Sequence, residues 1–230
     1  MIPLPPPQTE AARSPHTGFA LPRDIVFAPK RAFDTIAAAP EWLPAYLVVI
    51  VLLLGSLAMQ APAFLHVLAT TGATADELAA PQTQRDVIVD AAIEQLVYPL
   101  FVIGLTSTTL TAAARAKGKT TRLAVFAALA ANCLVPYGIG EFISGIAVRV
   151  RDPASFKDLH AIAVALPLNL ALFADPKNIR EVDFLSRFGL FGVWSFTLLA
   201  FGIARFAGLR FETALLVAFA LNFAFMAFLF

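Results

Sequence analysis

The stretch LPAYLVVIVLLLGSLAMQAPAFL, residues 43–65, decides the fold of this chain. It lies between Glu41 and Asp76, and no charged residue stands between those two positions. About 20 apolar residues in an α-helix cross a hydrocarbon core about 30 Å thick, because each residue adds about 1.5 Å. Lipid offers no hydrogen-bond partner to the backbone, whereas a helix satisfies its own amides. Residues 43–65 therefore predict a membrane-spanning helix.

Further stretches of the chain have the same character. They are residues 95–114, 123–148, 188–204 and 213–230, of which only 123–148 contains a charged residue, Glu141. Together with residues 43–65 they predict an all-α fold: a polytopic membrane helix bundle with five transmembrane helices.

The composition supports this fold class and excludes others. Hydrophobic residues make up 59% of the 230 residues and charged residues 14%, whereas globular chains have about 45–50% and about 25%. A soluble fold needs more polar surface than this. The net charge of +1 gives no attraction to nucleic acid. The single cysteine, Cys133, excludes an intrachain disulfide and a zinc site built from cysteines.

One further apolar stretch is too short to be counted with these. Residues 159–174, LHAIAVALPLNLALFA, would form about 24 Å of helix, which falls short of a full crossing. Pro167 and Asn169 also interrupt it. We expect an interfacial or re-entrant segment here.

Basic residues in the short loops set the expected orientation. Residues 115–122 contain four basic residues and no acidic one, and residues 205–210 contain two basic residues. Short cytoplasmic loops collect Lys and Arg. Five spans place both loops in the cytoplasm, whereas a sixth span at 159–174 would move Arg205 and Arg210 outside. We therefore expect a cytoplasmic N-terminus and a C-terminus outside.

The region before the first span divides into two parts. Residues 1–24 are proline-rich and lack the apolar core of a signal peptide, which predicts a disordered cytoplasmic tail; its PLPPP run could alternatively be a polyproline ligand. In the following segment Pro29 is typical of a helix start, Phe33 falls on an apolar face, and Pro40 ends the helix. Trp42 then marks a lipid interface. A short interfacial helix is expected before the first span.

Two blocks of residues resemble a known family. The first block is Pro29, Phe33, Ile36, Pro40, Trp42 and Leu43, and the second is Phe191, Trp194, Ser195, Leu198, Leu199, Gly202, Gly208, Leu209 and Arg210. A weaker third match is the basic turn at 117–119, followed by a span with a central Pro136. In this order the blocks resemble the Yip family (Ypt/Rab-interacting proteins), including its bacterial members, over most of residues 25–230.

The resemblance implies a five-span membrane domain over residues 25–230 that acts by helix packing and by protein or lipid contacts, in a role like membrane organisation or trafficking. The expected partners are the bilayer and other membrane proteins or further copies of the chain. A bacterial-type member would lie in the inner membrane. The best-described members of the family interact with Rab-type GTPases and with one another. Eukaryotic relatives usually have a longer N-terminal cytoplasmic region than the one seen here, so the resemblance gives little reason to expect GTPase binding.

Glu141 suggests an alternative function, because an ionisable residue inside a membrane span is expected to have a functional role. Counted from Leu123 it lies about 27 Å along the helix, close to the outer boundary of a core about 30 Å thick, whereas counted from Arg149 it lies about 12 Å deep. Pro136, Gly138 and Gly140 predict a break beside it, and broken helices build ion sites in transporters. The residue is therefore either interfacial and structural or the site of a small transporter or channel. A transporter predicts a water-accessible cavity that reaches Glu141; a scaffold predicts a closed bundle with apolar grooves.

Other chemistry finds no support in the sequence. The three histidines are scattered, and Gly118-Lys119-Thr120 lacks the earlier glycine of a phosphate loop. We expect no catalytic, cofactor or metal site and no enzyme. Small residues place the third and fourth spans at the bundle centre, where Asn132 and Asn222 could bond across helices. The phenylalanine-rich last span is expected to face lipid or a partner.

Overall fold

The computed structural model describes residues 18–71, 81–186 and 188–229, with the backbone alone at 71, 81–83, 179, 183 and 222–229. Within these residues it contains helices and no strand. The α-helices are α1 (Ala20–Phe27), α2 (Pro29–Ala38), α3 (Leu43–Thr71), α5 (Pro81–Ala116), α6 (Leu123–Cys133), α7 (Val135–Arg149), α8 (Leu159–Ala163), α9 (Ile179–Ser186), α10 (Leu190–Ala207) and α11 (Phe211–Leu229). Two short 3₁₀ helices are η1 (Pro153–Ser155) and η2 (Leu170–Phe173).

Helices long and apolar enough to cross a membrane confirm the predicted class. Within the described residues there are four: Leu43–Thr70, Gln84–Ala116, Leu123–Arg149 and Leu190–Ala207. The predicted fifth span falls on α11, whose fully described part, Phe211–Leu221, is apolar but shorter. The second helix is longer than predicted, because residues 84–94, which include four charged side chains, continue the helix beyond the charge-free stretch.

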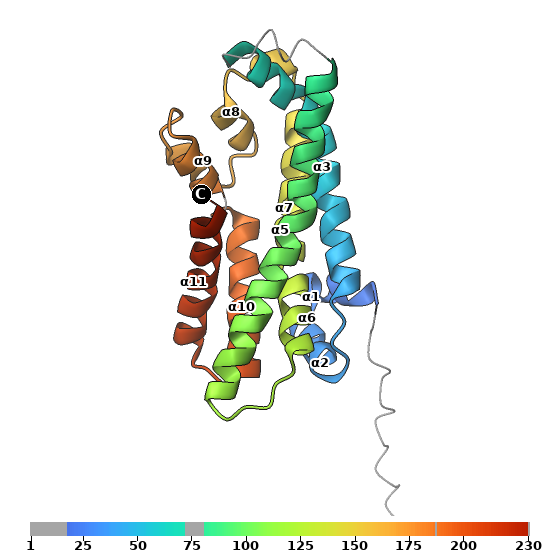
Figure 1. Ribbon diagram of the computed structural model, residues 1–230, viewed down its shortest axis with the longest axis vertical. Coiled ribbons are helices and arrows are strands. Elements are labelled where there is room, and N and C mark those ends of the chain that lie inside the picture. Colours follow the sequence, from blue (N-terminus) through green and yellow to red (C-terminus); the bar gives the residue numbers. More distant parts are fainter. Residues whose placement is uncertain (1–17, 72–80, 187, 230) are drawn as a thin grey trace, which may run out of the picture.

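The helices form an elongated bundle of unequal members (Figure 1). The long helices α3 and α5 and the α6–α7 pair run along most of its length, whereas α10 and α11 stand side by side against its lower part. Helix α5 has 36 residues and α10 has 18, which correspond to about 54 Å and about 27 Å. The long helices therefore continue past the level at which α10 begins, and α8 and α9 lie beside these extensions.

The α6–α7 pair forms the centre, as the small residues predicted. Phe126, Ala128, Leu129 and Ala131 are completely buried, although Ala124 is exposed. Helix α10 packs on this core at Gly202, where a Cβ would stand 2.1 Å from Cδ1 of Leu129. Asn132 is also fully buried and donates to the Ala128 carbonyl of its own helix (2.8 Å) and, at 3.4 Å, to that of Glu41. The side chain of Asn222 lies outside the described residues.

The predicted helix break lies just before Pro136, at Leu134 between α6 and α7. Proline has no N–H to donate to the carbonyl four residues earlier, and its ring crowds that turn. The amide of Tyr137 instead donates to Ser195 Oγ of α10 at 3.0 Å. Gly138 and Gly140 lie within α7 and make room for neighbours: a Cβ at Gly140 would stand 2.6 Å from Cβ of Phe191.

The short helix predicted before the first span is α2, which begins at Pro29 and ends at Ala38; its position at a membrane interface stays a prediction. A further helix, α1, precedes it and crosses the predicted tail boundary at residue 24, since Leu21 and Ile25 are buried against the bundle. Residues 1–17 of the predicted tail lie outside the described residues.

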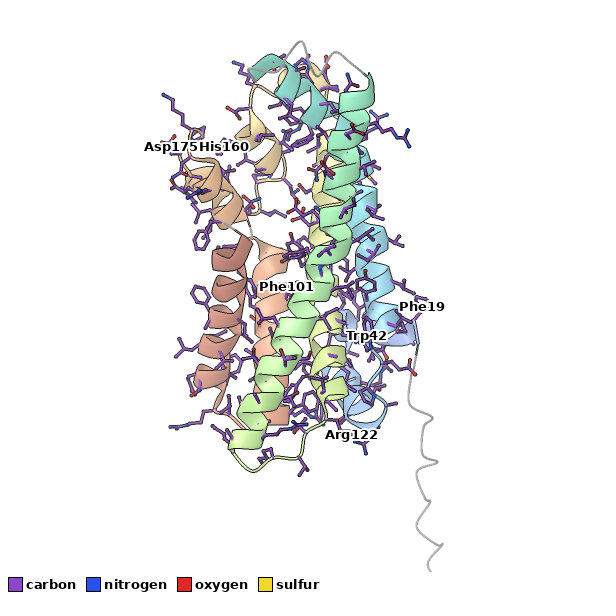
Figure 2. The ribbon with its side chains drawn as sticks, viewed as in Figure 1. Phe19, Trp42, Phe101, Arg122, His160 and Asp175 are labelled. Carbon is purple, nitrogen blue, oxygen red and sulfur yellow. The ribbon has the colours of Figure 1, made fainter. Side chains whose placement is uncertain are left out.

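The segment 159–174 is not a continuous helix. Helix α8 has five residues and η2 has four, and between them the Asn169 side chain donates to the Ala163 carbonyl (3.0 Å) and accepts from the Ala171 amide (3.0 Å). The interruption expected at Pro167 and Asn169 is therefore confirmed. We name α8, η2 and α9, residues 159–186, the cap; Figure 2 shows His160 and Asp175 in it, at the opposite end from Arg122.

Candidate functional site

A cavity of about 510 Å³ lies between the cap and the bundle, and we call it the upper cavity. Its walls come from α3, α5, α7, the cap and the start of α10. The lining residues are Gln60, Phe64, Glu94, Tyr137, Gly140, Glu141, Ser144, Leu159, Ile162, Ala163, Leu166, Leu168, Asn169, Val182, Ser186, Gly189, Leu190, Phe191 and Gly192. The cavity reaches the surface, because Glu94, Leu168 and Leu190 in its lining are exposed.

Glu141 lines this cavity from α7 and is partly buried. Close packing of α3 on α7 fixes its position, because a Cβ at Gly145 would stand 2.9 Å from Cα of Ser56. Ser56 Oγ donates to the backbone carbonyl of Glu141 at 2.7 Å and accepts from Gln60 Nε2 at 2.8 Å. The Glu141 side chain therefore extends from the closely packed helices α3 and α7, and the Gln60 amide lies in the same cavity wall.

The level of the cavity within the bundle follows from the helix lengths. Glu141 lies about 27 Å of helix above Leu123, and α10 begins at Leu190, about 26 Å above its end at Ala207. Glu94 on α5 lies about 33 Å above Ala116. If a hydrocarbon layer of about 30 Å starts at the lower end of the bundle, both carboxylates lie at its upper boundary.

The remaining polar groups of the lining are neutral. Ser144 lies one turn after Glu141, Asn169 and Ser186 come from the cap, and Tyr137 lies at the helix break with its ring 6.3 Å from that of Tyr98. Among the described residues no three His, Cys, Asp or Glu side chains are grouped as a metal site. The arrangement offers carboxylate and amide oxygens to a ligand that carries hydrogen-bond donors or positive charge.

The residues that carry the family resemblance lie in two separate places. Near the lower end Phe33 of α2 is buried against Phe206 of α10, with ring centres 6.4 Å apart, and Gly208 ends α10 at a φ of 65°. Pro29 begins α2 and Pro40 follows its end, and the ring of Trp42, which is partly exposed, lies 6.0 Å from the ring of Tyr46 between centres.

The second block lies on α10. Phe191 packs on Gly140 in the cavity wall, Gly202 receives Leu129, and Trp194 is partly exposed. Of the predicted family residues only Phe191 lines the cavity with Glu141. The others position helices.

Asp24 of α1 is a buried charge that the sequence analysis missed. Its side chain is 2% exposed, and Oδ1 accepts from Nη2 of Arg31 at 2.7 Å and of Arg23 at 3.1 Å. Burial by itself raises the pKa of this carboxyl, but the hydrogen bonds from Arg31 and Arg23 outweigh it and lower the pKa below 3.8. The sequence could have indicated this pair, because Asp24 lies between Arg23 and Arg31, and Arg31 follows the helix start at Pro29.

The residues of the upper cavity come from six helices and the loops beside them. Glu141 and the Pro136–Gly140 segment were the part that the sequence had indicated. Comparison of the chain with protein-family models, with curated proteins and with solved structures found no match. The resemblance to the Yip family therefore stays a prediction, and the function is argued from the cavity.

Proposed function

We propose that this chain is a small proton-linked transporter that uses Glu141 as its binding and proton-carrying group. The observation that supports it is the cavity of about 510 Å³ that reaches Glu141, since a closed bundle was the expectation for a scaffold. Its volume falls within the range of about 300–1,000 Å³ that is usual for small-molecule sites. A carboxylate at a membrane boundary beside a proline-interrupted helix is an arrangement that transporters use.

Apolar packing in the lower part of the bundle favours a transporter over a channel. Toward the lower end of the bundle, Phe126 and Leu129 of α6 and Ile203 of α10 are completely buried. Apolar packing of this kind leaves no continuous polar path for an ion. A ligand held at Glu141 would cross only after the helices rearrange, and the interruption at Leu134 is the natural hinge for that movement.

We also propose five spans with the N-terminus in the cytoplasm of a bacterium and the protein in its inner membrane. Supporting this, α2, the loop 117–122 and the end of α10 meet at one end of the bundle: Arg205 forms an ion pair with Asp34, and Thr121 Oγ1 donates to the Phe206 carbonyl at 3.0 Å. The basic residues that set the orientation are thus gathered at a single face. Helix α11, with 19 residues, would span about 28 Å as the fifth helix.

The test is proton entry into liposomes that contain the purified protein and an entrapped pH-sensitive dye, under an imposed membrane potential. We expect entry well above that of empty liposomes, and a fall of at least tenfold in Glu141→Gln. Glu212→Gln is the matched control, since Glu212 is exposed at the start of α11. Equal rates for the wild type and Glu141→Gln at equal reconstitution would reject the proposal.

A second candidate is the Yip-like role, in which the chain acts through contacts with membrane proteins, with other copies or with lipid. The apolar side chains on the outer faces of α3 and α5 favour it, with Val51 and Val97 more than half exposed. Such faces suit either lipid or a neighbouring helix. Cross-linking in native membranes followed by purification under denaturing conditions tests this candidate. Recovery of no specific protein partner and of no cross-linked dimer would exclude it.

A further inference from the structure

A second, smaller cavity lies directly below the upper one, inside the bundle. This lower cavity has a volume of about 60 Å³ and is lined, mostly by apolar side chains, from α5, α6, α7, α10 and α11. Tyr137 and Gly192 line both cavities, so the two spaces meet across these residues. Apolar cavities of this kind stay dry. The lower cavity suits the end of a hydrocarbon chain.

The mouth of the upper cavity is also apolar on one side. Leu190 and Leu168 line the cavity and are 60% and 46% exposed. An exposed apolar row is unfavourable in water and normal against lipid. Leu190 lies at the level of Glu141, near the upper boundary of the hydrocarbon layer. A molecule already dissolved in the bilayer would therefore reach this mouth from the side.

The polar side of the upper cavity specifies the other end of such a molecule. Glu141 and Glu94 bring two carboxylates, Gln60 and Ser144 add neutral oxygens, and the described part of the lining contains no Lys or Arg. Carboxylates at the edge of a low-dielectric layer favour a cationic donor over an anion.

We propose that the ligand of the upper cavity is a membrane amphiphile with an amine head group, which is held at Glu141 while its hydrocarbon chain enters the lower cavity past Tyr137. This inference rests on the proposed transport function and names the substrate class. An ammonium group and a proton then compete for the same carboxylate, which would link amine movement in one direction to proton movement in the other.

The test uses the full chain in phosphatidylcholine nanodiscs and a photoactivatable alkylamine with its reactive group near the end of the chain. We expect cross-links on residues of the lower cavity, such as Val102 and Leu105 of α5. Octylamine should compete at least tenfold better than ethylamine or octanoate, because only octylamine has both the head group and the chain. Glu141→Gln should lower the labelling at least tenfold, and Glu212→Gln should leave it unchanged.

A second pair of variants tests the chain site by itself. Ala218→Leu fills the lower cavity from α11, and Ala220→Leu makes the same change on an exposed position of that helix. We expect Ala218→Leu alone to abolish the cross-links, and Val102→Phe to do the same should Ala218→Leu not fold. Equal labelling of the two alanine variants, or equal competition by octanoate, would overturn the inference. Proton entry that still depends on Glu141 would then leave the proposed function standing, whereas loss of that dependence removes both.

Discussion

The carboxyl of Asp24 shows how a single buried charge links the two N-terminal helices, α1 and α2, to each other. Its pKa lies below 3.8 because Arg31 and Arg23 donate to it, despite burial. A lowered folded-state pKa means that the ionised form contributes stability above the unfolded pKa and that this contribution is lost as pH falls through the folded value. We expect Asp24→Asn to lower the free energy of unfolding by about 1–3 kcal/mol at pH 7, because the arginines lose an ionised partner.

The measurement is thermal unfolding in micelles, followed by circular dichroism between pH 7 and pH 3. The wild type should lose part of its advantage over Asp24→Asn only below about pH 4. Asp34→Asn is the control, since Asp34 and its partner Arg205 are both largely exposed, and exposed pairs contribute little. An Asp34→Asn effect as large as that of Asp24→Asn would contradict this account.

Another single residue, Ser195, supports the interruption between α6 and α7. Its hydroxyl accepts from the Tyr137 amide beside Pro136, a position where the helical hydrogen bonds are disturbed. We expect Ser195→Ala to destabilise the protein by about 1–3 kcal/mol, because the buried amide loses its partner. In a Pro136→Ala background the same change should matter less, since a regular helix supplies the missing acceptor. Thermal unfolding of the four proteins gives the coupling, and additive effects would show that proline and serine act independently.

Between elements, glycine contacts set how closely the helices approach. A Cβ at Gly202 would lie 2.1 Å from Cδ1 and 2.7 Å from Cδ2 of Leu129, which is itself completely buried. We expect Gly202→Ala to destabilise the α10–α6 contact by about 1–3 kcal/mol through overpacking. Gly104→Ala on α5 is the matched control, because nothing lies within 4 Å of its Cβ position, and helix propensity there favours alanine by about 1 kcal/mol. We expect thermal unfolding to show a lower melting temperature for Gly202→Ala and a higher one for Gly104→Ala. A similar loss of stability in both variants would refute the packing argument.

The sequence predicted the helices better than it predicted what they bring together. Charge-free stretches mark the spans, and within lipid such a stretch must be a helix because only a helix satisfies its own backbone hydrogen bonds. The helices α3, α6–α7 and α10 therefore lie close to their predicted ranges. Glu141 stood out because it is the one charge within such a stretch. The sequence did not show which residues surround Glu141, because Gln60 and Glu94 lie on other helices. The cap is held by local hydrogen bonds such as those of Asn169, which no sequence pattern had indicated. Helix α1 was not predicted because Arg23 and Asp24 give its sequence a polar character. The sequence alone does not show that Arg31 pairs with Asp24 and so allows it to be buried.

For the whole molecule, the proposed topology separates the cap from the loop at 117–122 by the full thickness of the membrane. Asp175→Cys in the cap and Thr120→Cys in that loop test this in intact cells with a membrane-impermeant maleimide. The native Cys133 is buried and should contribute little background. We expect Asp175→Cys to react in intact cells and Thr120→Cys only after lysis. A cysteine appended after Phe230 should behave like Asp175→Cys if α11 crosses as a fifth span and like Thr120→Cys if it does not, so this one position decides between five spans and four.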